Sequence, residues 1–364
     1  MGNFAEIKYS LYLKGVCVLG ESLLQTMADV KKIKINPDRK LFSATPEEIL
    51  RGETSDIYFV RTQEILSHLD LAETPVTAEA FCRRDGIFAG SEEVMRLLQN
   101  QDVEVWALPE GTPMQSKEVV LRIKGRYQEF GVYETALLGI MASSSGWATA
   151  AREVKDAADG KPVTCFGARH IHPAVAPVME RAAIIGGCDG ASCILAAKLA
   201  GREPQGTIPH AMILIIGDTV KAAQAYNEIM PADAPRTVLV DTFKDEAEET
   251  LRVAEALGDD LDAVRLDTPG ERGGVTLDLV KETRARLDQK GFSHVNIFVS
   301  GGLTPERIKL LSEAGANAFG VGSYISAARP IDMTLDLKEI NGEPLAKRGR
   351  IPGETPTERL VRKK

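Results

Sequence analysis

Two glycine-rich segments follow apolar runs near the end of the sequence, Val299-Ser300-Gly301-Gly302 and Phe319-Gly320-Val321-Gly322-Ser323. Glycine lets backbone N–H groups approach an anion closely, and the N-terminus of a following helix adds a favourable dipole. Tight turns that need glycine are the alternative explanation. We interpret the segments as a phosphate-binding site that consists of Ser300, Gly301, Gly302, Gly322 and Ser323.

Charged residues follow two other apolar runs. Arg169 comes after the run at 163–166, and Arg265 and Asp267 lie in Val264-Arg265-Leu266-Asp267-Thr268. Alternate residues of a strand face the same side, so Arg265 and Asp267 are expected to face one cavity. A cation and a carboxylate that face one cavity suit two neighbouring substrates, one with a carboxylate and one with hydroxyl groups and a bound metal. The alternative is that the two side chains only form a buried salt bridge. Beside a phosphate site, Arg169 is interpreted as an anion ligand.

Three histidines could also take part in chemistry. His170 and His172 are spaced like a metal-binding pair, but no acidic residue or third histidine lies close by in the sequence, so we favour no metal there. His210 directly precedes an apolar run at 212–216 that we predict to be a strand. From the residues alone, a structural histidine at the edge of that strand is the ordinary interpretation.

The elements that must position these residues alternate regularly from residue 160 onwards. Helical stretches separate β-rich runs at 163–166, 212–216, 237–240, 263–266, 295–299 and 318–321, with a further possible strand near 187–190. Such alternation predicts a parallel sheet, and the number of units indicates an α/β barrel, in which ligands bind at the carboxyl ends of the strands. An open doubly wound sheet is the alternative, although no Gly-x-Gly-x-x-Gly loop supports a dinucleotide-binding version.

Around this barrel the chain divides into four parts. Residues 1–40 lack a clear period and are expected to form a weakly ordered extension, in which Met27 could be the natural start. Residues 41–135 mix helices and strands and are expected to form an N-terminal α/β domain. The barrel domain spans 136–330, and the segment 331–364 is expected to return to the first domain.

Composition excludes several classes of protein. The chain has 364 residues with 44 Lys and Arg against 52 Asp and Glu, a net charge of −8 that argues against a strongly cationic nucleic-acid binder. Its five cysteines include no Cys-x-x-Cys pair, so we expect neither a disulfide framework nor a zinc site. No apolar run approaches the roughly 18 residues of a membrane span. We expect a cytoplasmic protein that binds no nucleic acid and no membrane.

Eight motifs in order give the sequence a specific resemblance. The chain resembles the nicotinate phosphoribosyltransferases of the shorter archaeal and bacterial branch. The resemblance rests on the two glycine segments and on Thr54-Ser55-Asp56-Ile57-Tyr58-Phe59, Tyr133-Glu134-Thr135-Ala136-Leu137-Leu138-Gly139, Phe166-Gly167-Ala168-Arg169, Gly186-Gly187-Cys188-Asp189-Gly190-Ala191-Ser192, Gly206-Thr207-Ile208-Pro209-His210 and Val264-Arg265-Leu266-Asp267-Thr268. It implies a type II phosphoribosyltransferase fold, which combines an N-terminal α/β sandwich domain with an incomplete parallel α/β barrel.

The same resemblance implies a reaction and its cofactors. Phosphoribose would pass from 5-phosphoribosyl 1-pyrophosphate to nicotinate, giving nicotinate mononucleotide and pyrophosphate in NAD salvage, with Mg²⁺ present and ATP hydrolysis coupled to the transfer. The sites of such enzymes form between subunits, so a homodimer or an assembly of dimers is expected.

Residue roles follow from the resemblance by position. Arg265 would bind the nicotinate carboxylate, and His210 would be phosphorylated by ATP. Arg169 and Thr207 would bind substrate, and Tyr58 lies in the segment expected to reach the base. Asp267 would be a catalytic residue and a metal ligand, and the glycine segments would hold the 5′-phosphate.

Two alternatives stay open. The first is a quinolinate phosphoribosyltransferase, whose substrate carries two carboxylates and loses one as CO₂, so that its site needs more cations. The second is a non-catalytic protein on the same fold that binds a phosphate-bearing ligand.

Overall fold

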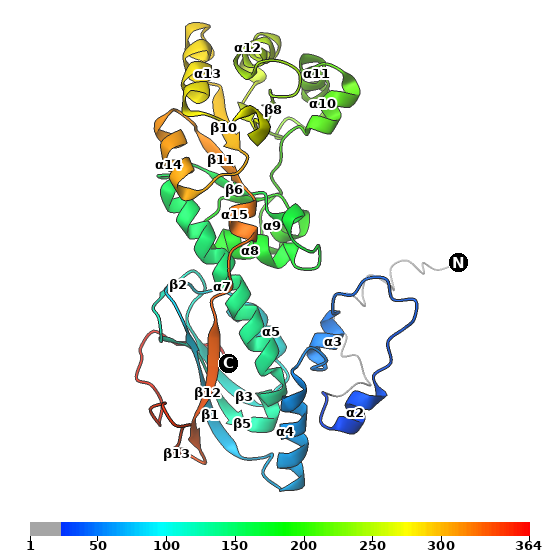
Figure 1. Cartoon of the computed structure of the whole chain (residues 1–364), viewed down its shortest axis with the longest axis vertical. Helices are drawn as coiled ribbons and strands as arrows, with labels where there is room; N and C mark the ends of the chain where they lie inside the picture. Colours follow the sequence, from blue (N-terminus) through cyan, green and yellow to red (C-terminus); the bar gives the residue numbers. More distant parts are fainter. Residues whose placement is uncertain (1–22) are drawn as a thin grey trace, which may run out of the picture.

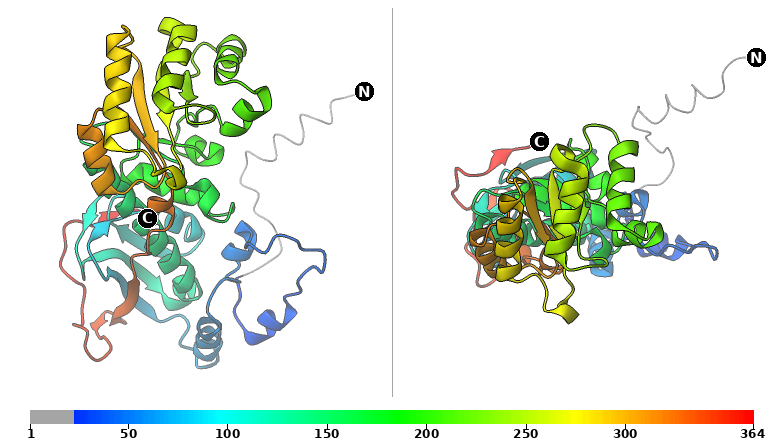
Figure 2. Two further views of the ribbon diagram at one scale, coloured as in Figure 1. Left: turned by 45° about the horizontal axis from the view of Figure 1, so that its top comes forward. Right: turned by 90° about the horizontal axis from the view of Figure 1, so that it is seen from above.

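The computed structural model describes residues 23–364, which form two sheets joined by one long helix (Figure 1). Predictions for residues 1–22, including that part of the expected extension, lie outside the described residues. The next segment contains three helices, α2 (Met27–Lys32), α3 (Pro46–Leu50) and α4 (Ile57–His68). The loop between α2 and α3 projects from the body in both views of Figure 2.

The N-terminal sheet is antiparallel and has the strand order β13-β12-β1-β5-β3-β14. The end of the chain returns to this sheet, because β12 pairs with β1 and β14 pairs with β3. Two further short strands, β2 and β4, form a separate antiparallel pair. The strands are β1 (Pro75–Cys82), β2 (Gly86–Ile87), β3 (Val103–Ala107), β4 (Pro113–Met114), β5 (Val119–Arg126), β12 (Met333–Ile340), β13 (Glu343–Pro344) and β14 (Val361–Arg362).

Helix α7 (Glu134–Ala157) links the two halves of the molecule (Figure 1). Its first turns bury Leu137 and Met141 in the core of the N-terminal sheet, and its last turns bury Ala151 and Val154 in the core of the second sheet. The N-terminal half also contains α5 (Ser91–Leu97), α6 (Tyr127–Phe130) and the 3₁₀ turn η1 (Gly131–Tyr133), and both α5 and η1 contact α7.

The second sheet is parallel and has the order β7-β6-β11-β10-β9-β8. The prediction of an incomplete parallel barrel after an N-terminal α/β domain is confirmed. The strands are β6 (Val163–Cys165), β7 (Gly190–Ala191), β8 (Thr237–Leu239), β9 (Ala263–Leu266), β10 (Asn296–Ser300) and β11 (Ala318–Val321). Around them lie α8 (Ala176–Gly186), α9 (Ile194–Leu199), α10 (His210–Ile216), α11 (Thr219–Ile229), α12 (Glu246–Leu257), α13 (Leu277–Gln289), α14 (Pro305–Glu313), α15 (Ser323–Ser326), η2 (Ala168–His170), η3 (Gly258–Asp260) and η4 (Gly270–Arg272).

An extended segment crosses the gap between the edge strands β7 and β8. Gln205 N donates to Ala191 O at 2.9 Å, and Ile208 N donates to Thr237 O at 3.4 Å. The Gln205 side chain covers Gly190, because a Cβ on Gly190 would lie 2.1 Å from Gln205 Oε1. Residues 205–208 therefore fix the open side of the barrel without adding a regular strand.

The predicted strand at 212–216 is wrong, because these residues lie in helix α10. Pro209 caps the helix in an extended conformation, and Gly217 ends it with a left-handed φ of 86°. A five-residue apolar run has too little length to distinguish a strand from a short helix. Leu214 and Ile215 are exposed on this helix, whereas Ile213 is fully buried.

Every helix of residues 23–364 is too short or too polar to cross a lipid bilayer.

Candidate functional site at the carboxyl ends of the barrel strands

Alternation along the barrel strands separates an apolar outer face from an inner face that is more polar. Val264 and Leu266 pack into the core beneath the helices, and Arg265 between them faces the other side. Arg265 stands opposite Phe298 of β10, and Ser300 stands opposite Gly320 of β11. The predicted common orientation of Arg265 and Asp267 is confirmed, because their side chains are hydrogen-bonded to each other.

Arg265 is held by three side chains. Its Nε donates to Ser300 Oγ at 2.8 Å, its Nη1 to Thr207 Oγ1 at 2.8 Å and its Nη2 to Asp267 Oδ2 at 3.1 Å. The residue is 9% exposed, and burial lowers the pKa of its guanidinium, although an arginine stays protonated in proteins. A guanidinium has five N–H groups, so two remain after these three bonds to described residues. Two N–H groups are what a carboxylate accepts in a bidentate pair.

One aromatic ring lies beneath this guanidinium, and a second ring stacks on the first. The Arg265 Cζ lies 5.1 Å from the centre of the Phe166 ring, and Phe166 stacks on Phe298 with ring centres 5.8 Å apart. Gly320 leaves room for both rings, because a Cβ there would lie 2.5 Å from Phe166 Cε2 and 2.9 Å from Phe298 Cε1. The contact with the ring face gives Arg265 a further fixed partner.

His210 lies between two carboxylates at the ends of β8 and β9. Its Nε2 is 3.6 Å from Asp241 Oδ2 and 3.9 Å from Asp267 Oδ2, and its Nδ1 is 3.1 Å from Thr242 Oγ1. Both Asp241 oxygens are buried and accept no hydrogen bond from the described residues. Burial raises the pKa of Asp241, and the nearby His210 acts in the opposite direction.

The glycine segments lie beside this cluster. Gly301 and Gly302 have left-handed φ values of 90° and 58°, and a Cβ on Gly301 would lie 3.1 Å from Asp267 Oδ1. Gly322 precedes Ser323 and α15, and a Cβ on Gly322 would lie 2.7 Å from His170 Cε1. The Ser300 hydroxyl, expected at the phosphate, instead donates to Asp267 Oδ1 at 2.7 Å and accepts from Arg265. Its side chain therefore belongs to the arginine network.

The remaining predicted site residues lie in different places. Arg169 lies in η2 after β6, exposed, and close enough that its charge lowers the pKa of Arg265. His172 makes a local contact, because its Nδ1 accepts from Ala174 N at 3.2 Å. Tyr58 lies on α4, 53% exposed, at the far end of α7 from the barrel (Figure 1). Within one chain, Tyr58 is therefore not brought to Arg265.

Several residues of the site carry no strong sequence signal. Gln205 resembles an ordinary loop residue, and Phe166 lies in one of the motifs but shows its contact with Arg265 only in the structure. Glu180 is a glutamate within the mostly apolar stretch of α8, and that contrast could have singled it out. Asp241 and Thr242 follow a predicted strand, so their place at its carboxyl end could be expected from the sequence.

A divalent cation fits these carboxylates only with ligands from elsewhere. Among residues 23–364, no group of three or more His, Cys, Asp or Glu side chains is arranged to hold a metal. Both Asp267 oxygens are hydrogen-bonded, whereas those of Asp241 are without partners. Mg²⁺ commonly uses one or two carboxylates together with water and substrate phosphates, and Asp241 beside Asp267 suits that mode.

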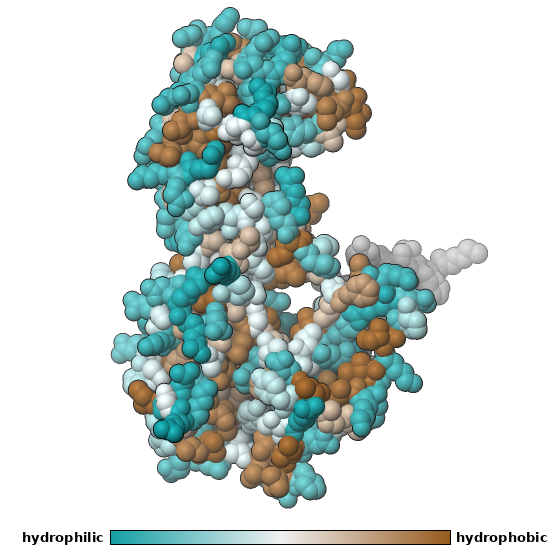
Figure 3. Space-filling model, in the orientation of Figure 1, coloured by the Kyte–Doolittle hydropathy of each residue, from teal (hydrophilic) through white to brown (hydrophobic). Residues whose placement is uncertain are grey.

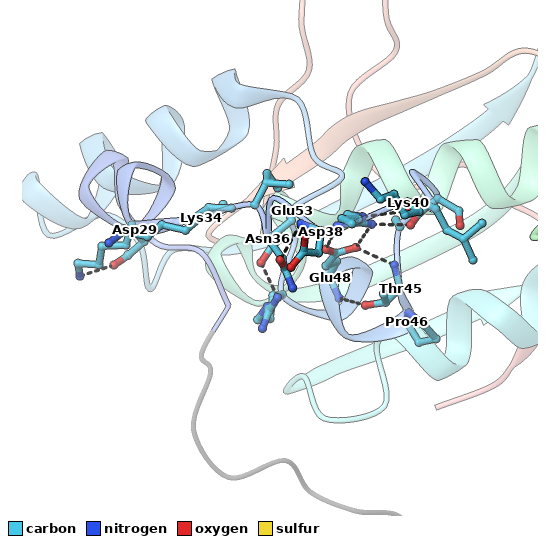
Figure 4. A pocket seen from close by; sticks show the side chains of 17 residues that line it. Asp29, Lys34, Asn36, Asp38, Lys40, Thr45, Pro46, Glu48 and Glu53 are labelled. Carbon is cyan, nitrogen blue, oxygen red and sulfur yellow. Dashed lines mark hydrogen bonds and ion pairs between the residues drawn. The ribbon is translucent and has the colours of Figure 1, made fainter.

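A separate hollow lies outside the barrel (Figure 4). Its volume is about 1130 Å³, and it is framed by α2, α3 and the loop between them. Arg39 Nη2 donates to Glu48 Oε2 at 2.9 Å and to Ser43 O at 2.5 Å, so the strongest charges there pair with one another. Nothing in this hollow gathers chemistry comparable to that of the barrel end.

Comparison with known proteins places the whole arrangement in a family. Residues 56–145 match the model of the quinolinate phosphoribosyl transferase N-terminal domain, and residues 147–336 match that of its C-terminal domain. A solved structure of a nicotinate-nucleotide pyrophosphorylase from Pyrococcus furiosus is 46% identical with a TM-score of 0.83, over 87% of this chain and 82% of that chain.

Curated relatives carry two kinds of name. A probable nicotinate-nucleotide pyrophosphorylase [carboxylating] of Methanothermobacter thermautotrophicus is 23% identical over 270 residues, 73% of this chain and 89% of that protein. A nicotinate phosphoribosyltransferase of Mycobacterium tuberculosis is 34% identical over 269 residues, 71% of this chain. The chain spans 56% of the length of that second relative, about half.

These matches correct the expected family. Membership of the nicotinate phosphoribosyltransferases is wrong, because both halves of the chain match the quinolinate models and a 46% identical structure carries the pyrophosphorylase name. The fold is accordingly the N-terminal domain and α/β barrel of that family, and not specifically the type II fold of nicotinate phosphoribosyltransferases. The chain belongs to the quinolinate phosphoribosyl transferase family.

Proposed function

We propose that this protein transfers the phosphoribosyl group of 5-phosphoribosyl 1-pyrophosphate to the ring nitrogen of a pyridine carboxylate, a step of NAD biosynthesis. The observation that carries the proposal is Arg265, which is buried, is fixed by three side chains and keeps two N–H groups that no residue of 23–364 accepts. It lies beside glycine segments suited to a phosphate, at the barrel end where ligands bind in this architecture.

The proposed chemistry needs orientation more than acid–base catalysis. The pyridine nitrogen already has a lone pair, so no general base has to activate it. Arg265 would hold a ring carboxylate in a bidentate pair and so aim that lone pair at C1 of the ribose. As the new N–C bond forms, the C1–O bond breaks and its electron pair leaves with pyrophosphate. Arg169 would stabilise that charge, and Mg²⁺ bound with the phosphates supplies further electrostatic stabilisation.

Quinolinate is the acceptor that family membership favours. It carries two adjacent carboxylates, and Arg265, with two N–H groups that no described residue accepts, would engage one of them. After transfer, the ring nitrogen is positively charged and withdraws electrons from the neighbouring carbon. The carboxylate on that carbon can then leave as CO₂, its electron pair staying on the carbon, which takes a proton to give nicotinate mononucleotide.

Nicotinate is a second candidate acceptor, favoured by the charge of the inner barrel face. Arg265 is the buried arginine there, and two carboxylates, Asp241 and Asp267, lie close to it. One cation suits a substrate with one carboxylate better than a substrate with two. The 34% identical Mycobacterium tuberculosis relative is named for nicotinate. With this acceptor, ATP would be a co-substrate that phosphorylates His210.

A second copy of the chain would complete the site. Apolar side chains are exposed on α9 and α10, including Ile194, Leu199 and Ile215, and they gather over α10 in Figure 3. Tyr58 and Ile65 are exposed on α4 of the N-terminal domain. Exposed apolar faces of this kind mark interfaces between proteins. A homodimer that places α4 of one copy against the barrel of its partner would bring Tyr58 near Arg265.

The proposal is tested by product formation with three acceptors in parallel. The protein is incubated with 5-phosphoribosyl 1-pyrophosphate, Mg²⁺ and quinolinate, nicotinate or nicotinamide, each with and without ATP. We expect nicotinate mononucleotide from a carboxylate acceptor and no product from nicotinamide, which lacks the negative charge for Arg265. CO₂ release identifies quinolinate as the acceptor. Failure with both carboxylates, or equal use of nicotinamide, would overturn the proposal.

ATP coupling has its own test. The protein and its His210→Ala variant are incubated with γ-labelled ATP, and the label retained on each is measured. Label on the wild type alone supports a phosphorylated His210, and equal label on both rejects that role.

A further inference from the structure

Glu180 is a buried carboxylate in apolar surroundings. It lies on α8, is 0% exposed, and has the core residues Met179, Ala182 and Ala183 as neighbours on the same helix. A carboxylate in such a position is costly unless hydrogen bonds satisfy both of its oxygens. The groups that donate hydrogen bonds to Glu180 therefore show which parts of the structure it holds in place.

Those partners belong to two loops at the carboxyl ends of neighbouring strands. Oε1 accepts from Ala168 N at 3.0 Å and from Ser192 Oγ at 3.0 Å, and Oε2 accepts from Cys193 N at 2.6 Å. Ala168 begins η2, which carries Arg169 after β6, whereas Ser192 and Cys193 join β7 to α9. One carboxylate thus ties both loops to α8.

The loop after β6 is also packed tightly between two helices. A Cβ on Gly167 would lie 2.6 Å from Met179 Cε and 3.3 Å from Ser326 Cβ, so the loop is wedged between α8 and α15. The His170 ring lies against Gly322 of the second glycine segment. Arg265, by contrast, is held by Ser300, Thr207 and Asp267, and none of its bonds involves Glu180.

We propose that Glu180 is a positioning residue that fixes the loops after β6 and β7 and thereby places Arg169 for the pyrophosphate of 5-phosphoribosyl 1-pyrophosphate. This inference rests on the proposed function. It separates the two substrates, because the loops held by Glu180 serve the phosphoribosyl donor, while the independent Arg265 network serves the pyridine acceptor. Loss of Glu180 is therefore expected to weaken donor binding selectively.

The test variant is Glu180→Gln, which keeps the size of the side chain but turns one acceptor oxygen into an NH₂ group facing a backbone N–H. Glu79→Gln is the matched control. Glu79 is equally buried and likewise accepts from a backbone N–H and a hydroxyl, those of Thr355 at 3.0 and 2.6 Å. It also pairs with Arg122 and lies in the N-terminal sheet, so this variant controls for the loss of a buried carboxylate far from the barrel end. The measurements are the KM for each substrate and calorimetric binding of the Mg²⁺ complex of 5-phosphoribosyl 1-pyrophosphate.

For Glu180→Gln we expect the donor KM and Kd to rise about tenfold or more, and the acceptor KM to stay within about twofold. Glu79→Gln is expected to leave the donor KM, the donor Kd and the acceptor KM unchanged. Equal changes in both KM values, no change, or the same split in the control would overturn the inference.

A second variant and a binding assay keep the test decisive. Ser192→Ala removes one of the three bonds and should raise the donor Kd by a smaller factor, so it replaces Glu180→Gln if that variant does not fold. An unchanged Kd in Ser192→Ala would then count against the inference. If the wild type shows no turnover, the proposed function fails, whereas the donor Kd still tests the role of Glu180.

Discussion

Gly320 offers a sharp test of how the barrel end is packed. A Cβ at this position would lie 2.5 and 2.6 Å from two atoms of the Phe166 ring and 2.9 Å from Phe298 Cε1. Carbon atoms in contact rest about 3.5–4.0 Å apart, so both rings would have to retreat by roughly 1 Å in Gly320→Ala. Overpacking of this kind costs about 1–3 kcal/mol of the free energy of unfolding.

The same displacement should reach the proposed acceptor site. Phe166 lies under the Arg265 guanidinium, with 5.1 Å between Cζ and the ring centre, so a retreating ring pushes against Arg265. A misplacement of about 1 Å in a positioning group can lower kcat/KM on the order of 100-fold. We therefore expect Gly320→Ala to lose both stability in urea unfolding and kcat/KM for the pyridine acceptor.

Gly139→Ala is the matched control for the added methyl group. Gly139 is an exposed residue of α7, and a Cβ there meets no atom within 4 Å. Alanine is favoured over glycine in a helix by about 0.8–1.0 kcal/mol, so this variant should be as stable as the wild type or more stable, with unchanged kinetics. Unchanged stability and unchanged acceptor kinetics in Gly320→Ala would refute the packing argument.

Three further predictions concern charge and the open side of the barrel. Burial raises the pKa of Glu134 from 4.5 to about 7, so the folded protein binds more protons than the unfolded chain between these values. The free energy of unfolding should fall as pH rises from about 4.5 to about 7, and this fall should be smaller in Glu134→Gln. Urea unfolding at several pH values measures the fall, and the same dependence on pH in both proteins would contradict the prediction. Asp241→Asn should raise the thermal stability at pH 7, because a buried carboxylate without hydrogen bonds is neutralised, and should lower the Mg²⁺-dependent rate; a destabilised or fully active variant would contradict this. Gln205→Ala removes the side-chain bond with Thr164, which supports residues 205–208 in addition to their backbone bonds, and should raise the acceptor KM through Thr207. An unchanged acceptor KM, with the donor KM as the control, would contradict it.

The sequence predicted what depends on local pattern. Alternation in Val264-Arg265-Leu266-Asp267 was enough to put two charged side chains on one face, and parallel strands bring their carboxyl ends together whatever their exact length. The helix at 212–216 could not be predicted in the same way. Its five consecutive apolar residues show neither the spacing of a helix nor that of a strand. Several of them are exposed in the structure, so hydrophobicity does not mark the buried face either.

Long-range pairs account for the rest of what was missed. The contacts of Glu180 with Ala168 and of Gln205 with Thr164 join residues 12 and 41 positions apart, and no local spacing predicts them. Tyr58 fits the expected motif, but α4 lies away from the barrel within one chain (Figure 1), and no local pattern shows that separation. The family was mistaken because an arginine for a carboxylate and glycine loops for a phosphate suit both kinds of pyridine acceptor.

The central claim is that Arg265 orients a pyridine carboxylate for phosphoribosyl transfer. The most direct measurement is kcat/KM for the acceptor in Arg265→Gln, together with the donor Kd by calorimetry. Glutamine can still hydrogen-bond within the site but lacks the positive charge. We predict that kcat/KM for the carboxylate acceptor falls on the order of 10–100-fold while the donor Kd stays unchanged. A variant that uses the acceptor as well as the wild type does would contradict the account.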